Sequence, residues 1–156
     1  MRIHLIAVGT RMPRWVNEGF ETYARRLERT TPLVLHEVPL ARGRKGTQGS
    51  QAALIEARGL LRKVPPRSWT VALDERGTTW STLELTRRLE AWRGAGRDLA
   101  LLIGGPDGLG ERCAKEADER WSLSPLTLPH GLVRVLVAEQ LYRASSILES
   151  HPYHRA

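Results

Sequence analysis

Four strand-like apolar runs, each followed by a segment with helical periodicity, constrain what this chain can fold into. The apolar runs are residues 2–10, 33–39, 70–77 and 97–105, and the helical segments after them are 14–29, 51–64, 82–95 and 111–121. A strand that is followed by a helix usually returns to the same sheet as a parallel neighbour. The pattern predicts one α/β domain over residues 1–156, in which helices sandwich a mostly parallel sheet.

Local signals refine the expected elements. Pro13 is suited to open the first helix, and Ser81 with Glu84 has the spacing of a capping box for the third. Residues 122–129 are expected to form a short strand or loop before a final helix over 131–150. The segment 40–51 holds three glycines and three basic residues without periodicity, so it is predicted to be a mobile basic loop.

Composition narrows the class of protein. The formal charge of +7 and the pI near 10.5 suit a polyanionic partner, although a genome rich in arginine codons explains 21 Arg among 24 basic residues equally well. The sequence shows no secretory signal and no apolar run near 18 residues, so we expect a cytoplasmic protein without a membrane partner. The single cysteine, Cys113, has no ligand partners at zinc spacing, and we expect it to be buried on a helix, with no metal site.

A glycine-rich turn, LLIGGPDGLG over residues 101–110, raises the question of a ligand. A P-loop would need Lys after the last glycine, but Glu111 follows Gly110. A dinucleotide fingerprint would need three glycines in the first strand-to-helix turn, which has one. What remains is a backbone at Gly104 and Gly105 that can approach a ligand closely, or a tight turn that holds no ligand.

The alternation of Leu with Ser, Pro and Thr in the segment 121–144 suits an adenine ring and a thioether, because it offers backbone hydrogen bonds between apolar side chains. Four motifs closely resemble the RlmH family: VALDERG, LLIGGPDGL, SLSPLTLPHGLVRVLVAEQLYRA and the terminal HPYHR. These SPOUT-class methyltransferases use S-adenosylmethionine to methylate N3 of a pseudouridine in large-subunit ribosomal RNA. The resemblance covers essentially the whole chain, and it implies a C-terminal trefoil knot and a homodimer.

The resemblance also implies which residues hold the cofactor. The matching positions are Leu73, Gly104 and the stretch Leu123, Ser124, Pro125, Leu126, Thr127 and Leu128. Pro125 lacks an N–H group and therefore cannot donate a backbone hydrogen bond. We expect Gly104→Val to abolish cofactor binding and leave the fold intact, because its side chain would occupy ligand space.

Catalytic candidates lie on the last helix. His130 stands at its start, and Arg134 follows on the same face, where a basic pair suits phosphate or negative charge developing on a uracil oxygen. A histidine in that place is as often a cap or surface group. Arg143 lies on roughly the opposite face from Arg134, so it either pairs with Glu139 on the helix surface or reaches the site of a partner subunit.

The last helix also carries apolar residues on more than one face, which predicts either a homodimer contact or burial within one subunit. The tail 151–156 is expected to be too short and polar to pack as an element, and a frayed end is the ordinary alternative. Tyr153 could instead stack on an unpaired base, while His154 and Arg155 bind phosphate or assist proton transfer.

Two other functions remain open from the residues. A non-catalytic RNA-binding factor in ribosome assembly would use the basic loop and the tail but would need no cofactor pocket. A knotted methyltransferase that acts on transfer RNA would share the fold and the cofactor and differ only in its substrate.

Overall fold

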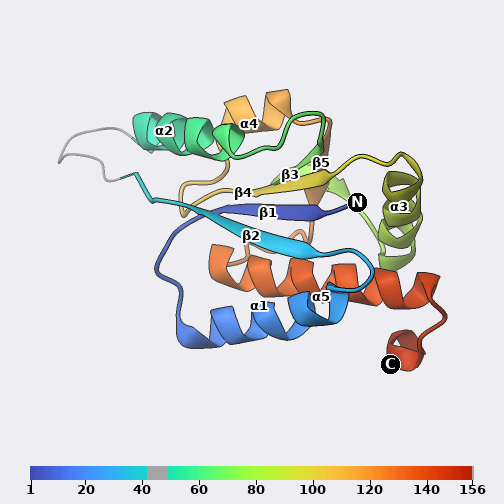
Figure 1. The fold of residues 1–156 in the computed structure, drawn as a ribbon. Helices are drawn as coiled ribbons and strands as arrows, with labels where there is room; N and C mark the ends of the chain where they lie inside the picture. Colours follow the sequence, from blue (N-terminus) through green and yellow to red (C-terminus); the bar gives the residue numbers. More distant parts are fainter. Residues whose placement is uncertain (42–48, 156) are drawn as a thin grey trace.

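Five parallel strands form one sheet in the order β2-β1-β4-β3-β5 in the computed structural model (Figure 1). The structure describes the backbone of residues 1–41 and 49–155, and the side chains of these residues except 49, 50, 154 and 155. The strands are β1 (Ile3–Val8), β2 (Leu33–Val38), β3 (Trp69–Thr79), β4 (Leu99–Ile103) and β5 (Glu119–Ser122). The predicted single α/β domain with a parallel sheet is confirmed, whereas the trefoil knot remains a prediction from the resemblance.

Helices cover both faces of this sheet (Figure 1). They are α1 (Arg14–Leu27), α2 (Gly49–Arg62), α3 (Thr82–Gly94), α4 (Glu111–Glu116) and α5 (His130–Leu148), followed by the short 3-10 helix η1 (Pro152–Arg155). Side chains alternate along each strand, so Leu101 packs with α1, α3 and α5 on one face, and Leu102 packs with α2 and α4 on the other. The core is therefore two apolar layers that share the strands of one sheet.

Several local predictions agree with the structure. Pro13 is the N-cap residue of α1, and Ser81 and Glu84 form both hydrogen bonds of the expected capping box. Cys113 is fully buried on α4, and burial raises the pKa of its thiol to about 11. His4 lies in β1, where its Nδ1 is 2.9 Å from Nε2 of His36 in β2.

Other local predictions are wrong in their bounds. The helix expected over 111–121 ends at Glu116, and residues 119–122 form the edge strand β5 instead. Asp118 accepts a hydrogen bond from the Thr70 N–H at 2.8 Å, and this contact with β3 replaces continuation of the helix. The loop expected over 40–51 ends earlier, because α2 begins at Gly49, and residues 42–48 lie outside the described part.

No helix in the described part of the chain combines the length and apolar character that a membrane crossing requires. Within those same residues, no three His, Cys, Asp or Glu side chains gather closely enough to hold a metal ion.

Candidate functional site

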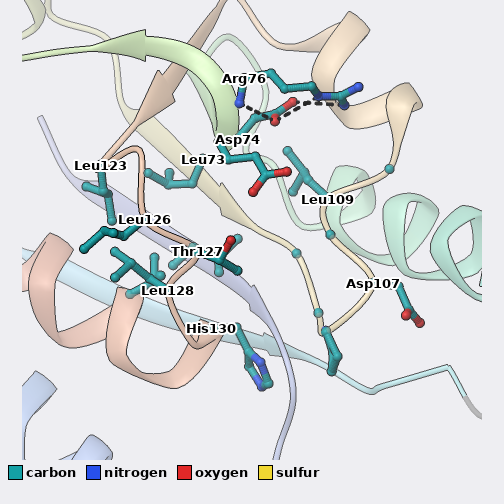
Figure 2. Close-up of a pocket in the computed structure, with 18 of the residues that line it drawn as sticks. Leu73, Asp74, Arg76, Asp107, Leu109, Leu123, Leu126, Thr127, Leu128 and His130 are labelled. Atoms are coloured by element: carbon teal, nitrogen blue, oxygen red, sulfur yellow. Dashed lines mark hydrogen bonds and ion pairs between the residues drawn. The ribbon is translucent and has the colours of Figure 1, made fainter.

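A cavity of about 710 Å³ lies at the carboxyl ends of β3, β4 and β5 (Figure 2). Ligands in open α/β sheets bind outside this edge, and the volume is in the range of small-molecule sites. The segments that follow the three strands converge there: 73–76 after the regular part of β3, 103–111 after β4, and the loop after β5 up to His130. The sheet topology therefore brings together the three segments that the sequence singled out.

The glycine segment forms a tight turn across one side of the cavity. The Gly108 N–H donates to the Gly105 carbonyl at 3.0 Å, with Pro106 in the second position of the turn and Gly108 at a φ of 87°. A Cβ atom added to Gly104 would lie 2.5 Å from Leu109 Cα, against the backbone of this turn. The expectation that Gly104→Val leaves the fold intact is therefore wrong, because the substitution would displace the turn itself.

Leucine side chains form the apolar wall of the cavity. Leu73 comes from β3 at the point where pairing with β5 is interrupted, and Figure 2 shows it near Leu123, Leu126 and Leu128 of the loop after β5. Thr127 and the glycine turn also line the hollow. Most of the predicted cofactor positions are thus brought together: Leu73, Gly104, Gly105, Leu123, Leu126, Thr127 and Leu128.

Ser124 and Pro125 differ from that group, since neither lines the cavity. Ser124 holds the loop in shape instead: its Oγ accepts from the Leu126 N–H at 3.0 Å, and its carbonyl accepts from Ser122 Oγ at 3.1 Å. These bonds turn the chain so that Leu126 and Thr127 face the hollow. The predicted direct contact of Ser124 and Pro125 with a ligand does not fit this placement.

Carboxylates gather on the rim of the cavity, and the sequence analysis missed them. The acidic lining residues are Asp74, Glu75, Asp107 and Glu111. Burial would raise the pKa of Asp74, but the Arg76 backbone N–H and guanidinium outweigh it and hold that pKa below its ordinary value (Figure 2). The available signal was a pair of acidic residues within the run 70–77 and one acidic residue each within and after the glycine turn.

His130 lies at the rim, at the start of α5, as predicted. Burial and the positive charge of Arg134 lower its pKa, so the neutral imidazole is the form present at pH 7. A neutral imidazole can accept a proton, which makes His130 chemically competent as a base.

Arg134 stands on the same face of α5 as His130, but it does not line the cavity. Its side chain is fully buried, and its guanidinium donates to Glu37 at 2.8 Å and to the carbonyls of Val8 and Gly9 at 3.1 and 2.7 Å. Because the guanidinium is fully buried and does not line the cavity, a substrate phosphate cannot reach the donors that these bonds leave over. The prediction that Arg134 faces developing negative charge does not fit the structure, and we assign it a positioning role between α5 and the ends of β1 and β2.

Arg143 lies three turns along α5 and forms the helix-surface pair with Glu139 that the spacing allowed, at 2.7 Å. Residues 152–155 form the short helix η1, contrary to the expectation that the tail is too short and polar to pack as an element. Tyr153 in η1 donates to Glu139 at 3.1 Å, its ring centroid is 4.6 Å from that of Tyr142, and Arg143 lies 4.9 Å from it. Burial, followed by hydrogen bonds with Tyr23 and Glu139, raises the pKa of Tyr153. The side chain of His154 lies outside the described part of the structure.

A family model described as "Predicted SPOUT methyltransferase" matches residues 1–154. The chain belongs to the SPOUT methyltransferase family. It is 55% identical over 156 residues to "Ribosomal RNA large subunit methyltransferase H" of Nitrosococcus oceani, covering 100% of this chain and 99% of that one. The protein of the same name from Alkalilimnicola ehrlichii is also 55% identical, with 100% of both chains covered.

Solved structures of other proteins share this fold. A probable methylase family protein from Haemophilus influenzae superposes with a TM-score of 0.54 at 16% identity, covering 97% of this chain and 69% of that one. A probable methyltransferase from Bordetella pertussis gives 0.53 at 17%, covering 91% and 95%. SPOUT methyltransferases use S-adenosylmethionine, so the predicted enzyme class and cofactor are confirmed.

The cavity fits this cofactor chemically. Its leucine wall suits the adenine and thioether parts, and the glycine turn leaves main chain open to the hollow. The carboxylates on the rim suit the positive charges on the cofactor's sulfonium and ammonium groups. The residues that would hold S-adenosylmethionine are therefore those of the converging segments.

Proposed function

We propose that this SPOUT enzyme transfers a methyl group from S-adenosylmethionine to large-subunit ribosomal RNA, and more finely to N3 of a pseudouridine on assembled ribosomes. The substrate class is supported by the relatives named for the large ribosomal subunit, which match this chain over its whole length. The observation that carries the proposal is the convergence of three separate segments on one cavity. Such a function places the protein in the cytoplasm, where ribosomes are.

The cavity supplies the two conditions that methylation of a ring nitrogen needs. S-adenosylmethionine would supply an electrophilic methyl group, and the leucine side chains of the lining would hold the apolar parts of the cofactor. The ring nitrogen carries a proton at neutral pH, and this proton must leave as the new bond forms. His130 is the neutral titratable group on the rim, next to the loop that closes the cavity. We therefore retain His130 as a catalytic candidate.

We further propose that the enzyme acts as a homodimer in which the tail of one subunit completes the cavity of the other. Figure 1 shows α5 running from the cavity edge of the sheet to the opposite end, where the tail packs. The tail packs on Glu139 and Arg143, which follow His130 by 9 and 13 residues, or by about 14 and 20 Å along the helix at 1.5 Å per residue. Arg143, Tyr153 and His154 can therefore serve as catalytic or RNA-binding residues only at a site that another subunit brings close.

Apolar residues on the outer side of α5 support this dimer. Leu132 and Leu136 are half-buried within the single chain, although α1 and α3 both pack against the helix. Sedimentation at micromolar concentration tests the association. A monomer that methylates RNA at full rate would contradict the shared site.

The function is tested by offering ribosomes, free large subunits and transfer RNA in parallel, with labelled S-adenosylmethionine. Methyl incorporation into large-subunit RNA is expected, and digestion to nucleosides would locate it on N3 of a pseudouridine. Methyl label found only in transfer RNA would show that transfer RNA, and not large-subunit RNA, is the substrate. Cofactor binding by calorimetry without methyl transfer to any RNA would contradict the proposed reaction.

A further inference from the structure

We propose that Trp15, together with Arg11 and Arg14, forms a second RNA-contact surface beside the cavity, in which the indole stacks on an unpaired base near the target nucleotide. This inference rests on the proposed action on RNA. It adds a contact that neither the cofactor segments nor the tail supplies.

Trp15 is unusual among the tryptophans of this chain. It is 56% exposed, whereas Trp92 and Trp121 are buried in the core and Trp69 and Trp80 are partly buried against it. A large aromatic side chain that is left in water at the start of a helix has no structural need to be there. The backbone at Trp15 is fixed, because the neighbouring Val16 is buried against the start of α5.

The position of Trp15 is fixed relative to the catalytic rim. A Cβ atom placed on Gly131 would lie 3.3 Å from Met12 Sδ and 3.4 Å from a methyl group of Val16, so the start of α1 packs on the start of α5. A Cβ atom on Gly9 would lie 3.8 Å from His130 Nε2. Figure 1 shows both helices beginning at the same end of the sheet, where the cavity lies. Trp15 therefore stands one helical turn or less from residues that touch the rim.

The charges around Trp15 select the partner. Arg11 and Arg14 are exposed, and Arg14 has 91% of its side chain in solvent while only its Nε is used in the pair with Glu18. A guanidinium has five N–H donors, so groups remain for a phosphate. An exposed aromatic ring that is close in the chain to exposed arginines suits single-stranded RNA, because the ring can stack on a base while the cations bind the backbone. An apolar contact between protein subunits would favour fewer charges at its centre.

The test uses the full-length protein and a hairpin RNA whose loop carries the target pseudouridine. Trp15→Ala is expected to weaken RNA binding about 5- to 150-fold, because loss of one base stack costs on the order of 1–3 kcal/mol. Trp15→Phe should retain most of the affinity, since it keeps a ring. Ile55→Ala is the matched control, because Ile55 is 60% exposed on α2, which covers the other face of the sheet.

A second readout does not depend on methyl transfer. RNA should quench the tryptophan fluorescence of the native protein, and the quenching should be largely lost in Trp15→Phe. Cofactor affinity, melting temperature and sedimentation should stay unchanged in both variants.

Two results would overturn the proposal. Unchanged RNA affinity in Trp15→Ala would show that the ring makes no contact with RNA. Conversion of Trp15→Ala to a monomer would show that Trp15 covers an interface between copies of this chain. Failure of the proposed reaction is separable, because quenching by the hairpin RNA would still be observed in an enzyme that methylates another site.

Discussion

Replacing Arg134 with Met should destabilise the fold by about 3 kcal/mol, although Arg134 makes no contact with the cavity. Met has a side chain of similar length to Arg but no guanidinium. The substitution therefore leaves the carbonyls of Val8 and Gly9 without the hydrogen bonds that Arg134 donates. An unsatisfied buried polar group costs about 1–3 kcal/mol, and removal of one partner from a buried ion pair costs about 3–5 kcal/mol. We take the lower end because the Glu37 side chain is 34% exposed and can be rehydrated.

Urea unfolding at fixed protein concentration measures this cost, provided that the slope with denaturant stays constant. Glu37→Gln should cost about 1–2 kcal/mol, because the amide oxygen still accepts the hydrogen bond but the charge pairing is lost. The double variant Arg134→Met, Glu37→Gln should lose less free energy of unfolding than the two single variants together, by about 1 kcal/mol or more. Arg14→Met is the control, and its exposed pair should contribute no more than about 0.5 kcal/mol.

A positioning role predicts a second effect that loss of packing alone would not cause. Arg134 lowers the pKa of His130 by its charge, so Arg134→Met should raise that pKa toward 6.5 in an NMR titration. A cost below about 1 kcal/mol, or additive single substitutions, would refute the coupling between α5 and the strand ends. An unchanged His130 titration would show that the two side chains do not interact.

Three further perturbations test the site and the fold. Thr127→Arg should abolish cofactor binding in calorimetry, because it places a long cation in a hollow built for a cationic ligand, whereas Thr79→Arg outside the cavity should bind normally. Deleting 151–156 should remove methyl transfer and spare cofactor affinity, and a mixture with Thr127→Arg subunits should regain activity only if the site is shared between chains. Lowered pKa values of His130 and His36 mean that the unfolded chain binds more protons, so stability should be complete above pH 6.5 and fall as the pH drops below it, as a series of urea titrations would show.

The parts of the fold that the sequence predicted are those that local patterns encode. Continuous apolar runs located the first four strands, helical periodicity located the helices after them, and the Ser81 and Glu84 pair marked a helix start to the residue. The short strand β5 has no such pattern, because four edge residues take their conformation from pairing with β3. The residue just before this strand, Asp118, accepts a hydrogen bond from the Thr70 N–H, and Thr70 lies 48 residues earlier in the chain.

The candidate site divides in the same way. The glycine turn and the leucine loop were recognisable because a close approach of main chain requires particular residues in sequence. The true position of Arg134 was not, because its partner Glu37 is 97 residues distant. The docked tail was missed for the same reason, since Tyr153 packs on Tyr142 and lies 5.9 Å from the Arg26 guanidinium of α1. Polar residues become packing residues when a distant partner satisfies them.

The length of α5 links these observations. Near its start Arg134 ties the helix to the strand ends that border the cavity, and in its middle and second half Glu139 and Arg143 hold the tail. A single chain thus holds its cofactor site and its tail about 14–20 Å apart along one helix. Two copies related by a two-fold axis, with their α5 helices antiparallel, would place each tail at the other's cavity and close the assembly with two identical sites. In that arrangement Trp15, at the cavity end of α1, and the partner's tail would face the same RNA loop from different subunits, so the loss of either contact should weaken RNA binding without affecting the cofactor.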